Sequence, residues 1–281
     1  MAHLALTLLL GITIAIASLA GGLLTIGGAI AQCLSAVILF GLGGWQYTIP
    51  IAAFFILSSG LSRVYNDAKM GAQQIAAKGS RRDFAQVLAN GGVATCVLIA
   101  AYFTRQESLY IGYLGAIAAA TADTWGTEIG NLSRTPPVLV STFYIVPPGT
   151  SGAISFPGTV AGLLGAVVIW LSGVAWIANE DRLQTFAAVT FGGMAGSFLD
   201  SLLGSTVQAN YKCPVCGKTT EKARHCGISS TCVRGSSIVN NDLVNSLSTV
   251  LGAIMSGVVY STFDSMPREV KKLLDLVRWF H

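Results

Sequence analysis

The chain has 281 residues, of which 52% are hydrophobic and only 11% are charged, with 32 glycines. Its mean hydropathy is +0.63. Soluble domains carry roughly 25% charged residues, so this composition excludes a disordered chain and argues against an ordinary soluble enzyme. The formal net charge of +4 is too small to indicate a nucleic-acid partner. We interpret the chain as an all-α, polytopic transmembrane helical bundle in the lipid bilayer.

Apolar runs of about 17–25 residues predict the membrane spans. We expect about eight spans, with seven or nine as alternatives, because the first two runs touch and the third is short. The runs are Leu4–Ala20, Leu23–Leu42, Tyr47–Leu61, Val87–Phe103, Leu109–Gly130, Thr159–Ile177, Gln184–Gln208 and Leu243–Ser261. They form a single domain over residues 1–265, which includes a Cys-rich loop at 209–242. Residues 266–281 have apolar residues at helical spacing and predict an interfacial amphipathic helix.

Basic residues favour one side of the predicted bundle. The loops after spans one, three, five and seven carry eleven of the seventeen Lys and Arg residues, which places these loops in the cytoplasm. The four basic residues of 266–281 count against this orientation. The acidic residues within the spans, Asp123, Glu128 and Asp200, lie toward the same side as the basic loops. We therefore expect a site that opens to the cytoplasm.

The two intramembrane aspartates give the strongest functional signal. A carboxylate at mid-span costs about 2.5–3.5 kcal/mol, so it is rarely present without a role. Asp123 follows Gly115 and Ala119 at four-residue spacing, and Asp200 follows Gly192 and Gly196 in the same way. Small residues at this spacing let helices approach closely, so both carboxylates could share a cation. Oxygen ligands favour Mg²⁺. The alternative is a buried aspartate that is hydrogen-bonded to a neighbouring helix.

Three cations precede the fourth span. Lys78, Arg81 and Arg82 could bind phosphates, with the arginines supplying bidentate geometry, or they could simply contact anionic lipid. Gln86 and Asn90 follow at four-residue spacing where the apolar run begins, and they favour a polar site.

A loop rich in Gly and Pro leads into the sixth span. Its glycines at Gly149 and Gly152 flank Thr150, and consecutive backbone N–H groups in such a loop can form an anion-binding nest. Gly158 and Thr159 follow, and we expect Thr159 to cap the helix and its N-terminus to attract phosphate. The alternative is an ordinary turn.

The cysteines fall into two groups. Cys33 and Cys96 lie within spans and are expected to be packing residues. The Cys-rich loop holds a Cys-x-x-Cys knuckle followed by a His-Cys pair and one more cysteine, which resembles a structural zinc site. Free or redox-active thiols are the alternative. The candidate ligands are Cys213, Cys216, His225, Cys226 and Cys232.

Four ordered motifs together resemble the transmembrane protein 19 family, from about residue 60 to residue 255. They are Arg81-Arg82-x-x-x-Gln86 with Asn90, Asp123-Thr124-x-x-Thr127-Glu128, Gly149-Thr150-x-Gly152 with Gly158-Thr159, and Asn241-Asp242-x-x-Asn245. That family includes the phytyl-phosphate kinase of vitamin E biosynthesis, and it is distantly similar to dolichol and phytol kinases. The nucleotide remains open, because Pro157 stands where the latter kinases have Glu.

The resemblance implies that a nucleoside triphosphate, such as CTP, transfers its terminal phosphate to a prenyl monophosphate. The residues themselves fit this reaction. The catalytic residues would be Asp123, Glu128, Asp200, Arg81 and Arg82, with Mg²⁺ bound by the two aspartates. The substrate-binding residues would be Lys78, Gln86, Asn90, Thr127, Gly149, Thr150, Gly152, Gly158, Thr159, Asn241, Asp242 and Asn245. The alternative function is a membrane transporter of a cation or small organic anion, since such proteins also place acids on glycine-rich helices.

Overall fold

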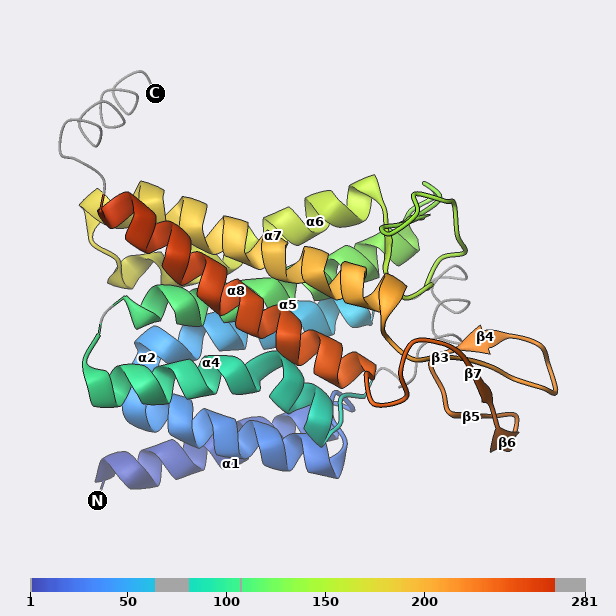
Figure 1. Cartoon of the computed structure of the whole chain (residues 1–281). Helices are drawn as coiled ribbons and strands as arrows, with labels where there is room; N and C mark the ends of the chain where they lie inside the picture. Colours follow the sequence, from blue (N-terminus) through green and yellow to red (C-terminus); the bar gives the residue numbers. More distant parts are fainter. Residues whose placement is uncertain (1, 64–80, 107, 266–281) are drawn as a thin grey trace.

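The computed structural model describes residues 2–63, 81–106 and 108–265, and over these residues the chain is mostly helical (Figure 1). Lys78 and the predicted interfacial helix at 266–281 lie outside the described residues. The described chain has seven α-helices, whose axes lie roughly along one common line. They are α1 (Ala2–Ala20), α2 (Ile26–Ser62), α4 (Phe84–Thr104), α5 (Leu109–Leu132), α6 (Phe156–Gly173), α7 (Arg182–Thr206) and α8 (Asn241–Asp264).

Short strands occur only in the two loops at one end of this bundle, among the residues described (Figure 1). Between α5 and α6, β1 (Val138–Leu139) pairs antiparallel with β2 (Ala153–Ile154). The Cys-rich loop between α7 and α8 forms a three-stranded sheet in the order β4-β3-β7 and a separate β5–β6 hairpin. Their bounds are β3 Asn210–Lys212, β4 Thr219–Thr220, β5 Arg224–His225, β6 Ile228–Ser229 and β7 Thr231–Arg234.

The 37-residue helix α2 reverses direction in its middle. Gly44 there has φ 59° and ψ −151°, which are non-helical values that glycine adopts without a steric penalty. A straight helix of this length would be about 55 Å long. However, the side chain of Arg63, just after α2, donates a hydrogen bond to the carbonyl oxygen of Gly21, just before it. Phe55 also packs against the cluster that contains Leu24, so the halves 26–43 and 45–62 lie antiparallel.

The prediction of eight spans is confirmed in part. Two predicted runs, Leu23–Leu42 and Tyr47–Leu61, fall in the two halves of α2, so the structure has seven helices. In the described chain, five helices are long and apolar enough to cross a membrane, namely α2, α4, α6 with its following turn, α7 and α8. In α1 the apolar stretch Ala5–Ala20 is shorter. The helix α5, which carries Asp123 and Glu128 in its second half, is not among these five.

The core of the bundle surrounds α5. Every residue from 110 to 122 is buried, as expected for a helix that is apolar on all sides and packed within other helices. Its residues join Leu98 of α4, Ile169 of α6 and Val189 of α7 in one hydrophobic cluster. The first charged residue of α5 is Asp123, where the helix leaves this core and approaches the end that carries the strands.

The small-residue stripes allow α5, α7 and α8 to touch through their backbones. A Cβ atom added to Gly252 of α8 would lie 2.6 Å from Cβ of Ala119 and 2.7 Å from the carbonyl oxygen of Gly115. One added to Gly196 of α7 would lie 2.6 Å from the carbonyl oxygen of Ser248. The close helix approach expected from the sequence is therefore confirmed, and it brings the second halves of α5 and α7 to the first turns of α8.

We predict that Gly252→Ala destabilises the protein, because the added methyl group meets backbone atoms and overpacking costs about 1–3 kcal/mol. The melting temperature in detergent, followed by the loss of monodisperse protein in size-exclusion chromatography after heating, should fall by several degrees. The matched control is Gly257→Ala on the same helix, where an added Cβ has no neighbour within 4 Å. Equal melting temperatures for the two variants would contradict the packing described above.

Candidate functional site

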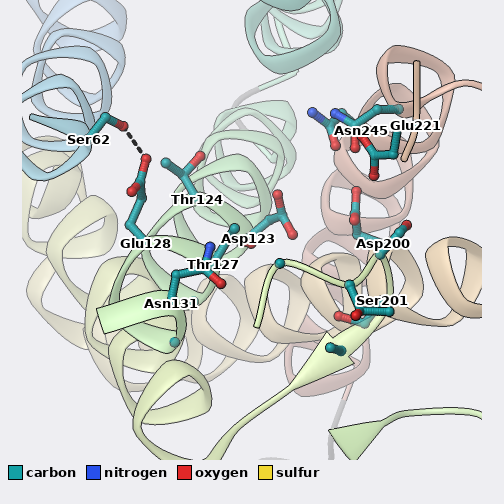
Figure 2. Close-up of a pocket in the computed structure, with 18 of the residues that line it drawn as sticks. Ser62, Asp123, Thr124, Thr127, Glu128, Asn131, Asp200, Ser201, Glu221 and Asn245 are labelled. Carbon is teal, nitrogen blue, oxygen red and sulfur yellow. Dashed lines mark hydrogen bonds between the residues drawn. The ribbon is translucent and has the colours of Figure 1, made fainter. Parts of the chain in front are cut away.

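A polar cavity of about 360 Å³ lies at the end of the bundle that carries the strands (Figure 2). Its walls come from the ends of α2, α5 and α7, the starts of α4 and α8, the β1–β2 loop and the Cys-rich loop. The structure brings thirteen of the predicted catalytic and substrate-binding residues together in this one cavity. They are Arg82, Gln86, Asn90, Asp123, Thr127, Glu128, Gly149, Thr150, Gly152, Asp200, Asn241, Asp242 and Asn245.

The two aspartates face each other across the cavity. Asp123 on α5 and Asp200 on α7 are half-buried, and their carboxyl groups interact directly. Glu221, from the Cys-rich loop, brings a third carboxyl group close to Asp200 (Figure 2). Oδ2 of Asp200 is buried and has no hydrogen-bond partner. These three carboxyl groups, one of which has a buried oxygen without a hydrogen-bond partner, form a set of oxygen ligands that suits a divalent cation.

Glu128 occupies a different wall of the cavity from the aspartates. The hydroxyl group of Ser62, at the end of α2, donates a hydrogen bond to Oε1 of Glu128 (Figure 2). Arg82 lies close enough to Glu128 for electrostatic attraction. The guanidinium group of Arg82 also lies over the rings of Phe54 and Phe55, at 5.3 and 5.8 Å from their centroids. These contacts hold one cation and one carboxylate side by side at the edge of the cavity.

The start of α4 positions two predicted residues. Asp83 and Gln86 form a capping box, in which each side chain accepts a hydrogen bond from the other residue's backbone N–H, at 2.9 and 3.0 Å. Asn90 donates from Nδ2 to the backbone carbonyl of Gln86 at 3.0 Å. Gln86 and Asn90 therefore line the cavity while they also stabilise the first turns of the helix.

The side chain of Arg81 points away from the polar cavity. Its guanidinium group donates hydrogen bonds of 3.0 and 3.3 Å to the backbone carbonyl of Leu24, between α1 and α2. It does not line the cavity, so among the described cations of this segment only Arg82 does so.

The β1–β2 loop packs against α7 beside Asp200. Gly149 and Gly152 both have positive φ, of 83° and 80°, in the region that favours glycine. A Cβ atom on Gly152 would lie 2.3 Å from the backbone nitrogen of Ser205. The side chain of Ser151 donates a hydrogen bond of 3.1 Å to the carbonyl oxygen of Gly204. The loop is thus fixed against α7, with Thr150 at the cavity wall.

The prediction that Thr159 caps α6 is wrong. The helix begins at Phe156, and Ser155 is its cap, accepting a hydrogen bond from the backbone N–H of Gly158. Thr159 instead donates its hydroxyl to the carbonyl oxygen of Ser155 at 3.0 Å, and does not line the cavity. Gly158 packs on α5, where an added Cβ would lie 2.6 Å from the carbonyl oxygen of Gly126. Gly158 therefore packs behind a part of α5 that lines the cavity, and Thr159 stabilises the first turn of α6.

The first turn of α8 faces the polar cavity. Asn240 caps the helix by accepting a hydrogen bond of 2.9 Å from the backbone N–H of Leu243. Asn241, Asp242 and Asn245 then line the cavity. The amide groups and dipole of a 24-residue helix favour anions at this end.

Sequence reasoning missed Glu221 and Ser62, which lie far from the motifs along the chain. The side chain of Gln208, which is almost fully buried, donates a hydrogen bond of 2.9 Å to Oε1 of Glu221 and fixes it at the cavity. Glu221 lies between the cysteine knuckle and the His-Cys pair, and only the fold of that loop brings it to Asp200. No periodicity or spacing in the sequence indicates this contact.

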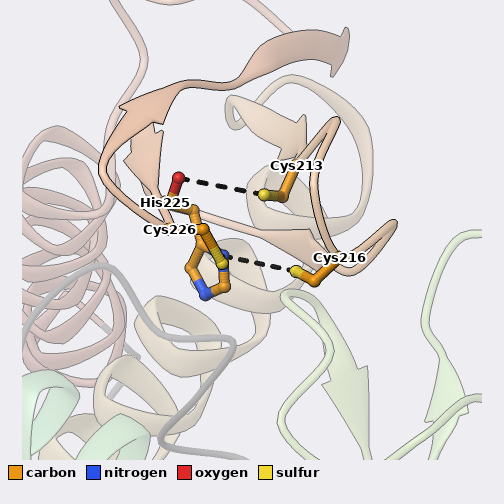
Figure 3. A group of neighbouring side chains, drawn as sticks. All are labelled: Cys213, Cys216, His225 and Cys226. Atoms are coloured by element: carbon orange, nitrogen blue, oxygen red, sulfur yellow. Dashed lines mark hydrogen bonds between the residues drawn. The ribbon is translucent and has the colours of Figure 1, made fainter.

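A second cluster lies in the Cys-rich loop (Figure 3). The ligand atoms of Cys213, Cys216, His225 and Cys226 all lie within 4.8 Å of one another, so these side chains could hold a metal ion. Cys232, the fifth residue expected there, lies outside this cluster, and its thiol donates to the carbonyl oxygens of Arg234 and Gly235.

The thiols of this cluster differ in their acidity. A backbone hydrogen bond from Cys216 is the largest of the effects that lower the pKa of Cys213, to about 6. The pKa of Cys226 is raised to about 11, chiefly by its hydrogen bond with the Cys216 side chain. The cluster thus contains a thiol that ionises readily, and thiolates are the form of cysteine that binds metals.

Comparisons with known proteins agree with the membrane architecture. An uncharacterized membrane protein of Methanocaldococcus jannaschii is 33% identical over 235 residues, which cover 84% of this chain and 85% of that protein. Protein PGR of Arabidopsis thaliana is 30% identical over 258 residues, covering 84% of this chain and 88% of its own. The chloroplastic protein VTE6 of the same plant is 24% identical over 247 residues, covering 84% and 66%. No solved structure matches the chain.

The model of the family described as integral membrane protein DUF92 matches residues 9–253. The match begins within α1 and ends within α8, and it includes the other five helices of the described chain completely. The chain is therefore a multi-pass integral membrane protein that belongs to the DUF92 family.

Proposed function

We propose that this protein transfers the terminal phosphate of a nucleoside triphosphate, such as CTP, to a prenyl monophosphate, and that the reaction takes place in the polar cavity. The observation that carries this proposal is the convergence of Asp123, Asp200 and Glu221 with Arg82 and the N-terminus of α8 on one cavity. Phosphoryl transfer needs charge neutralisation, cations that hold the phosphates, and alignment of donor with acceptor. The residues of this cavity are of the types that meet these needs.

Asp123 and Asp200 would hold Mg²⁺, and Glu221 lies near enough to assist them. The unpartnered Oδ2 of Asp200 fits this assignment, because a buried carboxylate oxygen needs a cation or a donor. When bound, Mg²⁺ would supply positive charge that neutralises the phosphates. The protein's part is to hold three oxygen ligands at one point and to keep them away from the lipid.

Arg82, the β1–β2 loop and the N-terminus of α8 would bind the phosphates. Arg82 offers a fork of N–H groups, while residues 149–152 and the first turn of α8 offer backbone amides. An oxygen of the prenyl monophosphate would attack the terminal phosphorus, and the bond to the bridging oxygen would break to release the nucleoside diphosphate. A phosphate monoester is already ionised near pH 7, since its second pKa is about 6, so no strong general base is needed.

The distant relationship to VTE6 also supports the proposed function. The motifs that line the cavity are those that resemble the transmembrane protein 19 family and its phytyl-phosphate kinase. VTE6 is 24% identical to this chain, so its likeness supports a related membrane function without fixing the substrate. The transporter alternative is less favoured, because the buried residues 110–122 of α5 fill the bundle beyond the cavity.

We expect the cavity to face the cytoplasm. Nine of the eleven described basic residues lie at the end of the bundle with the cavity, and Arg105 and Arg182 lie at the other end. The nine are Arg63, Arg81, Arg82, Arg134, Lys212, Lys218, Lys222, Arg224 and Arg234. The positive-inside rule then assigns the cavity end to the cytoplasm.

Reporter fusions in a bacterial host test this orientation. Alkaline phosphatase fused after Ser265 should be active, since it would lie outside the cytoplasm, while a green fluorescent protein fused there should stay dark. Fusions after Leu132, at the cavity end of α5, should give the opposite pattern. The reverse result at both positions would place the cavity on the outer face and would remove its access to cytoplasmic nucleotides.

Asp123→Asn should abolish kinase activity while the protein remains folded. The substitution keeps the size of the side chain and removes the charge that a metal requires. A bound metal contributes several kcal/mol to such reactions, which corresponds to a rate loss of about 100-fold or more. Turnover should be measured with purified protein, phytyl or geranylgeranyl phosphate, and each nucleoside triphosphate in the presence of Mg²⁺. Asp200→Asn should behave in the same way.

Asp264→Asn is the matched control, because this exposed aspartate lies at the far end of α8. It should retain normal turnover. Near-normal turnover in Asp123→Asn would place the metal elsewhere, and loss of monodisperse protein in that variant would favour a structural role for the carboxylate.

The Cys-rich loop would bind a structural zinc ion that orders the segment carrying Glu221. Three cysteines and one histidine are a known structural zinc set, and tetrahedral ligands about 2.3 Å from zinc lie about 3.8 Å apart. The observed separations of up to 4.8 Å are close to this arrangement. Glu221 lies between the two ligand pairs in the sequence, so an ordered loop would keep it at the cavity.

Purified protein should therefore contain about one zinc ion per chain by mass spectrometry of the metal, because structural zinc binds tightly. Cys216→Ser should lose the metal and lower both stability and activity. Cys232→Ser is the matched control and should keep its zinc, since that thiol lies outside the cluster. A zinc-free wild-type preparation of equal stability would show that the thiols serve another purpose.

A further inference from the structure

A second cavity, almost wholly apolar, lies beside the polar one. It has a volume of about 170 Å³ and lies between α1, the two halves of α2 and the start of α4. Its apolar walls include Leu39, Ile51, Phe54, Phe55 and Val87. We call it the apolar crevice. It exists only because α2 reverses at Gly44 and sets its two halves side by side.

The crevice and the polar cavity share three residues. Arg82, Gln86 and Asn90 line both of them, so the two spaces meet at the first turns of α4. Arg82 marks the border, because its guanidinium group lies over the rings of Phe54 and Phe55 and also faces Glu128. A ligand that reaches across this border needs an anionic group for Arg82 and an apolar group for the crevice.

We infer that the apolar crevice binds the part of an isoprenoid chain that is attached to the phosphate, with the phosphate itself on Arg82. This inference rests on the proposed function and names the part of the acceptor that is recognised. Charge complementarity at Arg82 selects an anionic amphiphile rather than a neutral lipid or a second protein helix. An ordered apolar tail in the crevice would direct the phosphate toward the carboxylates of the polar cavity.

The size of the crevice limits what it can recognise. An apolar cavity of about 150 Å³ holds one molecule the size of benzene. About 170 Å³ therefore accommodates roughly one isoprene unit, and the remainder of the chain would lie in the bilayer or along the lipid-facing helices. The crevice can distinguish the unit next to the phosphate, and it cannot measure the full chain length. Farnesyl and geranylgeranyl phosphates should accordingly have similar KM values.

Ala52→Phe tests the crevice by filling it. Ala52 lines the crevice on the second half of α2, whereas Ala100 on α4 is exposed, so Ala100→Phe is the matched control. The KM for geranylgeranyl phosphate should rise about tenfold or more in Ala52→Phe, while the KM for the nucleotide stays unchanged. Ala100→Phe should leave both values unchanged. Equal KM values for the lipid in both variants would overturn the inference.

A photoreactive probe gives a result that does not depend on catalysis. Farnesyl phosphate with a diazirine in the isoprene unit next to the phosphate should crosslink to peptides of α2 and α4 that contain Ile51 or Val87. Farnesol with the same diazirine should label them much less, since it lacks the anion. Crosslinking to these peptides in a protein without kinase activity would support the crevice and contradict the proposed function. Crosslinking only to other helices would overturn the crevice, whatever the activity.

Discussion

A carboxylate among membrane helices is costly unless polar groups or cations surround it, and this constraint governs the architecture of the bundle. Asp123 and Asp200 lie on different helices, so they can share surroundings only if the helices approach closely. The glycines of α5, α7 and α8 permit that approach, as the short distances around Gly196 and Gly252 demonstrate. The same contacts bring the N-terminus of α8 to the aspartates. Helix packing and site assembly therefore have a single physical origin.

Two loops complete the wall of the polar cavity that the helices form. The β1–β2 loop is fixed to α7 through Gly152, and the Cys-rich loop delivers Glu221 to Asp200 through its hydrogen bond with Gln208. Neither loop has an extensive core of its own, since their strands are only two to four residues long. Their order must come from contacts with the helices and, for the Cys-rich loop, from the ligand cluster around Cys213. A metal ion there would replace the missing hydrophobic core.

The sequence predicted Asp123 and Asp200 because a carboxylate in an apolar run is conspicuous, and their glycine stripes predicted that the two helices would meet. Glu221 could not be predicted, because its proximity to Asp200 depends on the path of an irregular loop. The break between the predicted runs Leu23–Leu42 and Tyr47–Leu61 coincides with the reversal at Gly44. Ser62 was still missed, because a serine at the end of an apolar run belongs to none of the motifs. The cap predicted for α6 was wrong because the helix begins at Phe156, three residues before Thr159, and Ser155 caps it.

Arg82 shows why the polar and apolar parts of the site belong together. A buried guanidinium group needs compensation, which it receives from Glu128 on one side and from the faces of Phe54 and Phe55 on the other. Lysine could not replace it equally well, because an ammonium group is more strongly hydrated and cannot stack on a ring in the same way. A cation that is stable at such a border can attract an anionic head group while aromatic rings line the path of its tail. In the proposed reaction, this one side chain would therefore set both the position of the phosphate and the direction of the chain attached to it.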